Sequence, residues 1–208
     1  MVDEKDSGSR KKIDSIIVTV ISISWALWQL SLPRLLILDS LKIRAIHLAF
    51  AVTLVFLTNP FRKHKKKIKS LHVPDHIPLI DYILAGLAGL AVLYIMFDRT
   101  GISMRLGRPL MRDVIFSVAL IILLLEASRR VIGPALASIA ILFSLYAFCG
   151  AYMPSIFALK GISLTKYVSQ LALSTEGIYG IPLDVSASTV FLFVLLGAML
   201  HKVGAGQF

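Results

Sequence analysis

Apolar runs of about twenty residues, each bounded by charged residues, constrain this chain more than any other feature of its sequence. A helical run of that length crosses about 30 Å of hydrocarbon, and a soluble domain of 208 residues cannot bury several of them. Only 16% of the residues are charged, against roughly 25% in an average soluble domain. We therefore predict an all-α, polytopic transmembrane protein with about six transmembrane helices, at about residues 13–32, 43–57, 77–97, 114–125, 135–152 and 186–200.

The basic residues lie beside the apolar runs rather than in a separate basic domain. The formal net charge is +10, which in a soluble protein would suggest nucleic acid as a partner. No basic stripe with interleaved aromatic residues occurs outside the spans, so nucleic acid is not an expected partner. Basic residues at span ends instead set the topology and contact anionic lipids, which we expect as partners. Cys149 is the only cysteine, so no internal disulfide is possible.

The distribution of lysine and arginine predicts the orientation of the chain. One side of the membrane collects the amino terminus, the dense basic segment 62–69 and Arg129-Arg130. The other side collects Arg34, Lys42, Arg44, four arginines of residues 99–112, Lys160 and Lys166. Positive charge concentrates on the cytoplasmic side, and the dense block decides the balance. We therefore predict a cytoplasmic amino terminus, with residues 154–185 facing outward and a short amphipathic helix at about residues 164–173.

Four ionisable side chains near span ends are candidates for structural or packing roles. On a helix, Glu126 lies three residues before Arg129 and four before Arg130, so opposite charges share one face. His47 lies near the start of the second span, where hydrogen bonding in the interface is favoured over proton relay. Gly86 and Gly89 in the third span are expected to let a neighbouring helix approach closely.

The sequence predicts no catalytic, cofactor-binding or metal-binding residues. His72, Asp75 and His76 form the nearest approach to a metal-ligand cluster, but Pro74 breaks the helix that would align them. No serine–histidine–aspartate pattern, phosphate loop or carboxylate pair is recognisable, so we do not expect an enzyme. Asp113 and Asp184 precede spans and are expected to favour the helix starts.

Several segments of the chain resemble one family of membrane transporters. The resemblance is to the fused membrane subunit of tripartite ATP-independent periplasmic (TRAP) transporters, in which small and large permease parts form one chain. It covers most of the sequence after Arg44. The matching segments are residues 44–47 (RAIH), 56–60 (FLTNP), 123–134 (LLLEASRRVIGP), 176–186 (EGIYGIPLDVS), 191–198 (FLFVLLGA) and 204–206 (GAG).

The resemblance implies a secondary transporter for small organic anions in the bacterial cell inner membrane, driven by an ion gradient, usually sodium. It implies a periplasmic substrate-binding protein of the TAXI type as a partner, with dicarboxylates or glutamate-like acids as substrates. Residues 1–130 then form a four-helix, small-permease-like scaffold, and residues 131–208 begin the large-permease-like region. That region is expected to be truncated, with the rest of the permease as a further partner and the substrate and ion residues beyond Phe208.

The outward-facing segment 163–185 is then a candidate docking surface for the binding protein. Its candidate residues are Glu176, Gly177, Gly180 and Asp184. Two other classes of function compete with the transporter. One is a membrane-embedded enzyme acting on lipids, with His47, Glu126 or His201 as acid–base groups. The other is a helical adaptor that assembles partners without transport.

Overall fold

The computed structural model confirms an all-α protein. It describes residues 2–32, 38–61, 77–105, 107–154 and 158–204, and within them it contains helices and no strand. The basic segment 62–69 and the triad His72, Asp75 and His76 lie outside the described residues. The elements are α1 (Val2–Ser31), α2 (Ser40–Thr58), α3 (Leu79–Phe97), α4 (Arg99–Met104), α5 (Met111–Val131), α6 (Pro134–Cys149), the 3-10 turn η1 (Gly150–Tyr152), α7 (Leu164–Ala172), α8 (Ile181–Val185), the π-helical η2 (Ser186–Val190) and α9 (Phe191–Lys202).

Five helices among the described residues are long and apolar enough to cross a membrane. Each apolar stretch is 19 to 22 residues long, which matches the roughly 20 residues that a bilayer requires. This establishes a multi-pass membrane protein. The stretches are Lys12–Ser31, Ser40–Thr58, Leu79–Phe97, Pro134–Tyr152 and Ile181–Lys202.

The fourth predicted span corresponds to α5, which is not among these five helices. It has 21 residues but carries Arg112 and Asp113 at its start and Glu126, Arg129 and Arg130 at its end. These charges leave a central apolar run of only twelve residues, 114–125. Among the described residues, five of the six predicted spans therefore qualify by length and composition.

Contacts at both ends nevertheless place α5 antiparallel to α3 along its length. At one end the Tyr94 hydroxyl of α3 donates to the carboxylate of Asp113. At the other end Arg130 donates to Asp81, in the first turn of α3. Because α3 is a candidate span, α5 extends over the same thickness of the molecule, between charged groups that are paired with α3.

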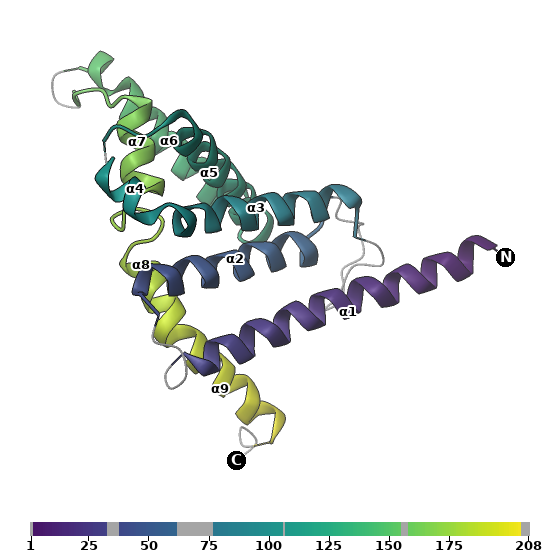
Figure 1. The fold of residues 1–208 in the computed structure, drawn as a ribbon. Helices are drawn as coiled ribbons and strands as arrows, with labels where there is room; N and C mark the ends of the chain where they lie inside the picture. Colours follow the sequence, from purple (N-terminus) through teal and green to yellow (C-terminus); the bar gives the residue numbers. More distant parts are fainter. Residues whose placement is uncertain (1, 33–37, 62–76, 106, 155–157, 205–208) are drawn as a thin grey trace.

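The core is formed mainly by α2 and α3, which lie side by side in Figure 1. Their facing surfaces are rich in alanine, which allows the two backbones to approach closely. Gly86 and Gly89 were both expected to let a neighbouring helix approach closely. A Cβ added at Gly89 would contact Thr53 of α2, in agreement with this, whereas a Cβ added at Gly86 would have no atom within 4 Å. The buried alanines are Ala45 and Ala49 of α2 and Ala85, Ala88 and Ala91 of α3.

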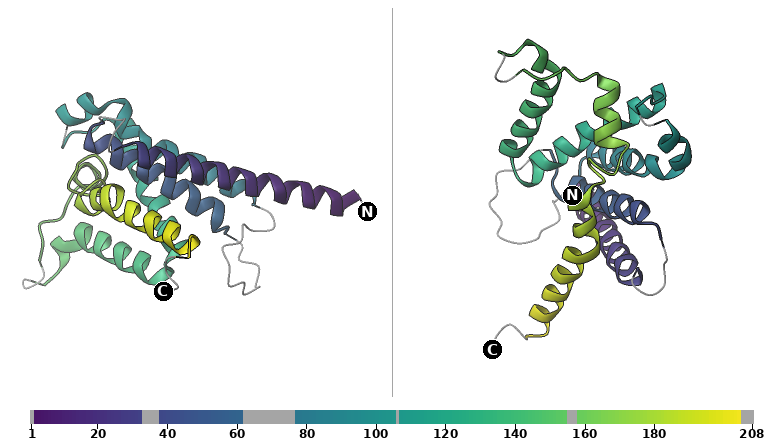
Figure 2. Two further views of the ribbon diagram at one scale, coloured as in Figure 1. Left: turned by 90° about the horizontal axis from the view of Figure 1, so that it is seen from below. Right: turned by 90° about the vertical axis from the view of Figure 1, so that its left-hand side faces the viewer.

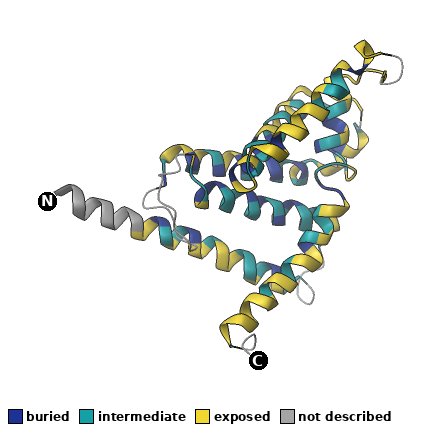
Figure 3. Cartoon of the chain, turned by 180° about the vertical axis from the view of Figure 1, so that it is seen from behind, coloured by how far each residue is buried: buried dark blue, intermediate teal, exposed yellow. Residues whose placement is uncertain are grey.

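The helices α6 and α9 lie at the periphery, as Figures 1 and 2 show. The structure describes both in full; α6 buries one residue, Ala137, and α9 buries none. Figure 3 shows α9 almost entirely exposed, in contrast to the buried positions along α2 and α3. Exposed apolar side chains on helices of this length are at low free energy in contact with lipid.

Hydrogen bonds cross the proposed boundary at residue 130. Gln29 donates to the carbonyl of Ala187, Arg44 to Asp184, and the hydroxyl of Tyr179 to the carbonyl of Val92. Residues 179–187 therefore pack onto the first region through specific polar contacts. The division into residues 1–130 and 131–208 stays a prediction.

The antiparallel arrangement predicts opposite accessibility at the two ends of the bundle. Thr58 ends α2 and Thr100 follows α3, so the two exposed threonines lie at opposite ends. In a Cys149→Ala background, a membrane-impermeant maleimide added to spheroplasts should label Thr100→Cys and leave Thr58→Cys unlabelled until the membrane is permeabilised. Labelling of Thr58→Cys alone would reverse the orientation, and labelling of both would contradict a spanning arrangement.

Candidate functional site

The candidate residues Glu126, Arg129 and Arg130 belong to an ionic cluster that joins three helices at one end of the bundle. We call it the Arg130 cluster; it also contains Asp81 of α3 and the backbone carbonyl of Asn59, the C-cap of α2. Arg130 Nη1 lies 2.7 Å from Asp81 Oδ1 and 3.0 Å from the Asn59 oxygen. One guanidinium group therefore ties the end of α5 to the end of α2 and the start of α3.

The Arg130–Asp81 pair is almost completely buried. The Arg130 side chain is 3% exposed and that of Asp81 0%. The rings of Phe56 and Phe61 lie 4.7 and 5.7 Å from the guanidinium carbon, a geometry that favours a planar cation. A buried charge without its partner destabilises a protein by about 3–5 kcal/mol. The pair is therefore a strong constraint on how α3 and α5 pack.

Glu126 completes the neutralisation of the two arginines. Its carboxylate accepts from Arg129 at 2.7 Å and from Arg130 at 2.8 Å, which confirms the predicted pairing along one helix face. The hydrogen bond from Arg129, together with that from Arg130, lowers the pKa of Glu126 to about 2. The carboxylate therefore stays ionised at physiological pH. The sequence did not reveal Asp81, because a partner 49 residues away leaves no local pattern.

His47 is buried in a chain of hydrogen bonds at the opposite end of α2. The residue is 4% exposed, so its hydrogen bonds are made within the protein. Nδ1 lies 3.2 Å from Gln29 Oε1 and Nε2 lies 3.4 Å from Ser186 Oγ. The rings of Trp25 and Phe191 pack against the imidazole at 5.1 and 5.6 Å. The expected structural role of His47 agrees with these contacts.

The hydrogen-bond partners assign a direction to this chain. The Gln29 amide nitrogen donates to the Ala187 carbonyl, so its oxygen is left to accept from His47 Nδ1–H. His47 Nε2 then accepts from the Ser186 hydroxyl. This series of hydrogen bonds begins at Ser186 and ends at Ala187, both in η2, where the backbone hydrogen bonds follow the π-helical rather than the α-helical spacing. It ties α1 and α2 to the helix that leads into α9.

The segment 176–184, which contains the candidate docking residues, is held to α2 and α3 through Tyr179 and Asp184. Arg44 of α2 donates from Nε to Asp184 Oδ1 at 2.8 Å and from Nη1 to the Tyr179 carbonyl at 2.7 Å. The Tyr179 side chain is fully buried and its hydroxyl bonds the Val92 carbonyl of α3. Burial raises the pKa of the Tyr179 phenol, which therefore stays protonated and donates. Of the four predicted docking residues, Glu176 is exposed, and the side chain of Asp184 is 40% exposed although it pairs with Arg44.

Asp184 is not the N-cap of its helix, but it lies in the first turn of α8, where a negative charge favours the helix start as expected. The helix begins at Ile181, with Gly180 as its N-cap and Pro182 in its first turn, and continues without a break through η2 into α9. Asp184 therefore lies inside the helical segment and pairs with Arg44 and Ser40. Asp113 behaves as expected, since it is the third residue of α5 and accepts from the Leu110 backbone at 2.9 Å.

Two further polar clusters escaped the sequence analysis. Asp14 of α1 is buried and accepts from the Tyr82 hydroxyl at 2.7 Å and from the Ile77 backbone at 2.9 Å. Asp98, between α3 and α4, accepts from Arg105 at 2.8 Å and Arg112 at 2.6 Å. The hydrogen bond from Arg105 is the main cause that lowers the pKa of Asp98. Charges placed close to apolar runs were the available signal, but they did not identify the partners.

The described residues do not bring the proposed acid–base groups together. His47 lies beside Gln29 and Ser186, whereas Glu126 lies with the arginines at the other end of α2. His201 is exposed in the last turn of α9. Within the part of the chain that the structure describes, no group of three histidine, cysteine or acidic residues could hold a metal ion.

Comparison with known proteins identifies no relative of this chain. No protein-family model, no curated protein and no solved structure matches it. The functional argument therefore depends on the residues and their contacts.

The tight turn after α7 yields a test of how the segment 176–184 packs. A Cβ at Gly177 would lie 2.2 Å from the Leu171 carbonyl oxygen, whereas one at Gly86 would meet nothing within 4 Å. We expect Gly177→Ala to lower the free energy of unfolding by about 1–3 kcal/mol because the backbone must shift, and Gly86→Ala to cause no loss. Unfolding in detergent, followed by circular dichroism, measures both. Equal stability of the two variants would contradict the close approach.

Proposed function

We propose that this chain is the membrane scaffold portion of an ion-gradient-driven secondary transporter for small organic anions. In this proposal it lies in the bacterial inner membrane with a cytoplasmic amino terminus and works with a periplasmic substrate-binding protein. The assignment as a multi-pass membrane protein rests on the five apolar helices. The transport function rests on the resemblance of its segments to the fused TRAP permease.

One observation supports the scaffold role most directly: two of the segments that carry the resemblance also make the long-range polar contacts. The segment 123–134 supplies Glu126 and Arg130, which bond α2 and α3. The segment 176–186 supplies Tyr179 and Asp184, which bond Arg44 of α2, itself in a matching segment. A sequence motif retained for scaffolding would be expected to make such contacts.

The buried charges also favour a scaffold over a transport pathway. Arg130 is neutralised by Asp81 and Glu126, and Asp113 bonds Tyr94 and the Leu110 backbone. Transport sites in such folds are built at unwound helices between inverted repeats. We therefore place substrate and ion binding in the large permease portion and assign neither to a residue of this chain.

The outer face is the proposed contact for the binding protein. With a cytoplasmic amino terminus, α7 and the turn after it lie at the periplasmic end, beside the start of α2. Glu176 is exposed there, while Gly177, Gly180 and Asp184 would act indirectly by fixing the position of the turn.

The competing functions find less support in the geometry. An acid–base enzyme needs several polar groups that converge on one substrate, and the described His47, Glu126 and His201 lie in three different surroundings. A non-transporting adaptor would have the same scaffold contacts, so it must be distinguished by assay.

The decisive assay is reconstitution with the two partners that the proposal requires. The chain would be placed in proteoliposomes with the large permease portion and supplied with a TAXI-type binding protein loaded with a labelled organic acid. We expect uptake that depends on an inward sodium gradient and falls to background when potassium replaces sodium or the binding protein is omitted. No uptake by the complete assembly would contradict transport, and turnover of a lipid by this chain alone would favour the enzyme.

A further inference from the structure

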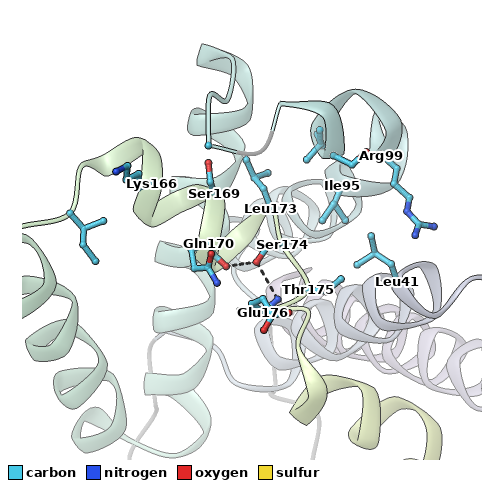
Figure 4. Close-up of a pocket in the computed structure, with 14 residues that line it drawn as sticks. Leu41, Ile95, Arg99, Lys166, Ser169, Gln170, Leu173, Ser174, Thr175 and Glu176 are labelled. Atoms are coloured by element: carbon cyan, nitrogen blue, oxygen red, sulfur yellow. Dashed lines mark hydrogen bonds between the residues drawn. The ribbon is translucent and has the colours of Figure 1, made fainter.

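A cavity of about 740 Å³ lies between α7, α4 and the adjoining ends of α2 and α3. Figure 4 shows α7 on one side of it, with Lys166, Ser169 and Leu173, and residues Ile95 and Arg99 on the other. Lys166, Ser169, Gln170 and Leu173 recur at helical spacing, so a single face of α7 lines the cavity. None of the contacts described above uses this space.

The α7 wall carries two polar side chains that bond no other described side chain: Ser169, which is buried, and Lys166, which is exposed. Ser169 is 5% exposed, and its hydroxyl has no hydrogen-bond partner among the described residues, although buried hydroxyls are normally bonded. Lys166 lies one turn earlier, and no described carboxylate is within ion-pair distance of it. A ligand with a negatively charged oxygen group would satisfy both side chains.

The remaining charges near the cavity leave this position favourable to an anion. Arg99 contributes a second cation from the opposite wall and is paired with Asp39. Glu176 is the one carboxylate that lines the cavity, and it follows the end of α7, whereas Lys166 lies in the first turn. The negative charge of Glu176 is therefore separated from Lys166 by the length of the helix.

An apolar part of the lining lies at the edge of the candidate spans, beside the polar side chains of Ser103, Gln170, Ser174 and Thr175. Leu41 lies in the first turn of α2, Ile95 in the last turn of α3, and Ile102 and Leu173 complete the apolar surface. The cavity thus lies where candidate spans end, at the level at which hydrocarbon gives way to headgroups. A small hydrophilic anion would leave this apolar surface uncovered.

We propose that this cavity binds a membrane phospholipid, with its phosphate group on Lys166 and Ser169 and its glycerol and upper acyl chains against Leu41, Ile95, Ile102 and Leu173. The lysine supplies the charge and the serine hydroxyl donates to a phosphate oxygen, which removes the unsatisfied hydroxyl. The assignment does not depend on transport and applies equally to a scaffold or an adaptor.

The test separates the phosphate from the acyl chains. The full chain in detergent would be titrated with phosphatidylglycerol, with diacylglycerol, which lacks the phosphate, and with glycerol 3-phosphate, which lacks the chains. Native mass spectrometry gives the bound lipid, and thermal unfolding gives the stabilisation. We expect phosphatidylglycerol to bind and stabilise the protein, and the other two to do so at least about tenfold more weakly, since each satisfies half of the site.

Two variants and a control locate the effect. Lys166→Gln should weaken phosphatidylglycerol binding by about tenfold through loss of a charge-assisted contact. Ser169→Ala should unfold at the same or a higher temperature than the parent without lipid, because its hydroxyl is unbonded, yet gain less from phosphatidylglycerol. Lys160→Gln removes an exposed lysine that does not line the cavity and should behave as the parent.

Three results would overturn the proposal. Unchanged lipid binding by both cavity variants would show that phosphatidylglycerol binds elsewhere. Diacylglycerol as effective as phosphatidylglycerol would show that the phosphate is not recognised. Glycerol 3-phosphate as effective as the lipid would make the cavity a site for a free anion.

Discussion

The buried ion pair between Arg130 and Asp81 is the interaction on which the arrangement of the helices most depends. A charge in an apolar surrounding must be neutralised by a neighbour, and here the neighbour belongs to another helix. The pair therefore fixes which faces of α3 and α5 meet and at what height. The Asn59 carbonyl brings the end of α2 to the same guanidinium, so three helix ends converge on one side chain.

A second set of polar contacts holds the other end of α2 to its neighbours. Arg44 holds Asp184 and the Tyr179 carbonyl, and Tyr179 reaches the backbone of α3. His47 adds the chain from Ser186 through Gln29 to Ala187, which attaches α1 and η2. Because both ends of α2 are tied to its neighbours, the apolar helices between them need only pack small alanine faces.

The sequence predicted the features that are local and failed for those that are not. Apolar length and the spacing of Glu126, Arg129 and Arg130 are properties of single segments, and the structure confirms the helices and the pairing. Asp81 and Arg130 are brought together only by the fold, so the sequence around one of them does not predict the other as its partner. His47 was expected in the interface because it is close to a span end, and its burial depends on Trp25 and Phe191 from distant segments.

The candidate docking residues also show that a sequence pattern predicts local structure but not its long-range packing. Glycines at 177 and 180 with an aspartate at 184 indicate a turn before a helix, and a turn is present. Its packing depends on the backbone at Leu171 and on Arg44, which the turn sequence does not reveal. The position of Ser169 and Lys166 on the wall of a cavity likewise becomes visible only in the fold, which places α7 across that cavity from α4 and the end of α3.

A double-mutant cycle on Arg130 and Asp81, measured as the free energy of unfolding in mixed micelles, tests the central claim most directly. Arg130→Ala should cost about 3–5 kcal/mol because it leaves Asp81 buried without a cation. Asp81→Ala should cost less, since Glu126 still neutralises Arg130. Adding Asp81→Ala to Arg130→Ala should therefore restore part of the lost stability, whereas a double variant less stable than Arg130→Ala alone would contradict the account.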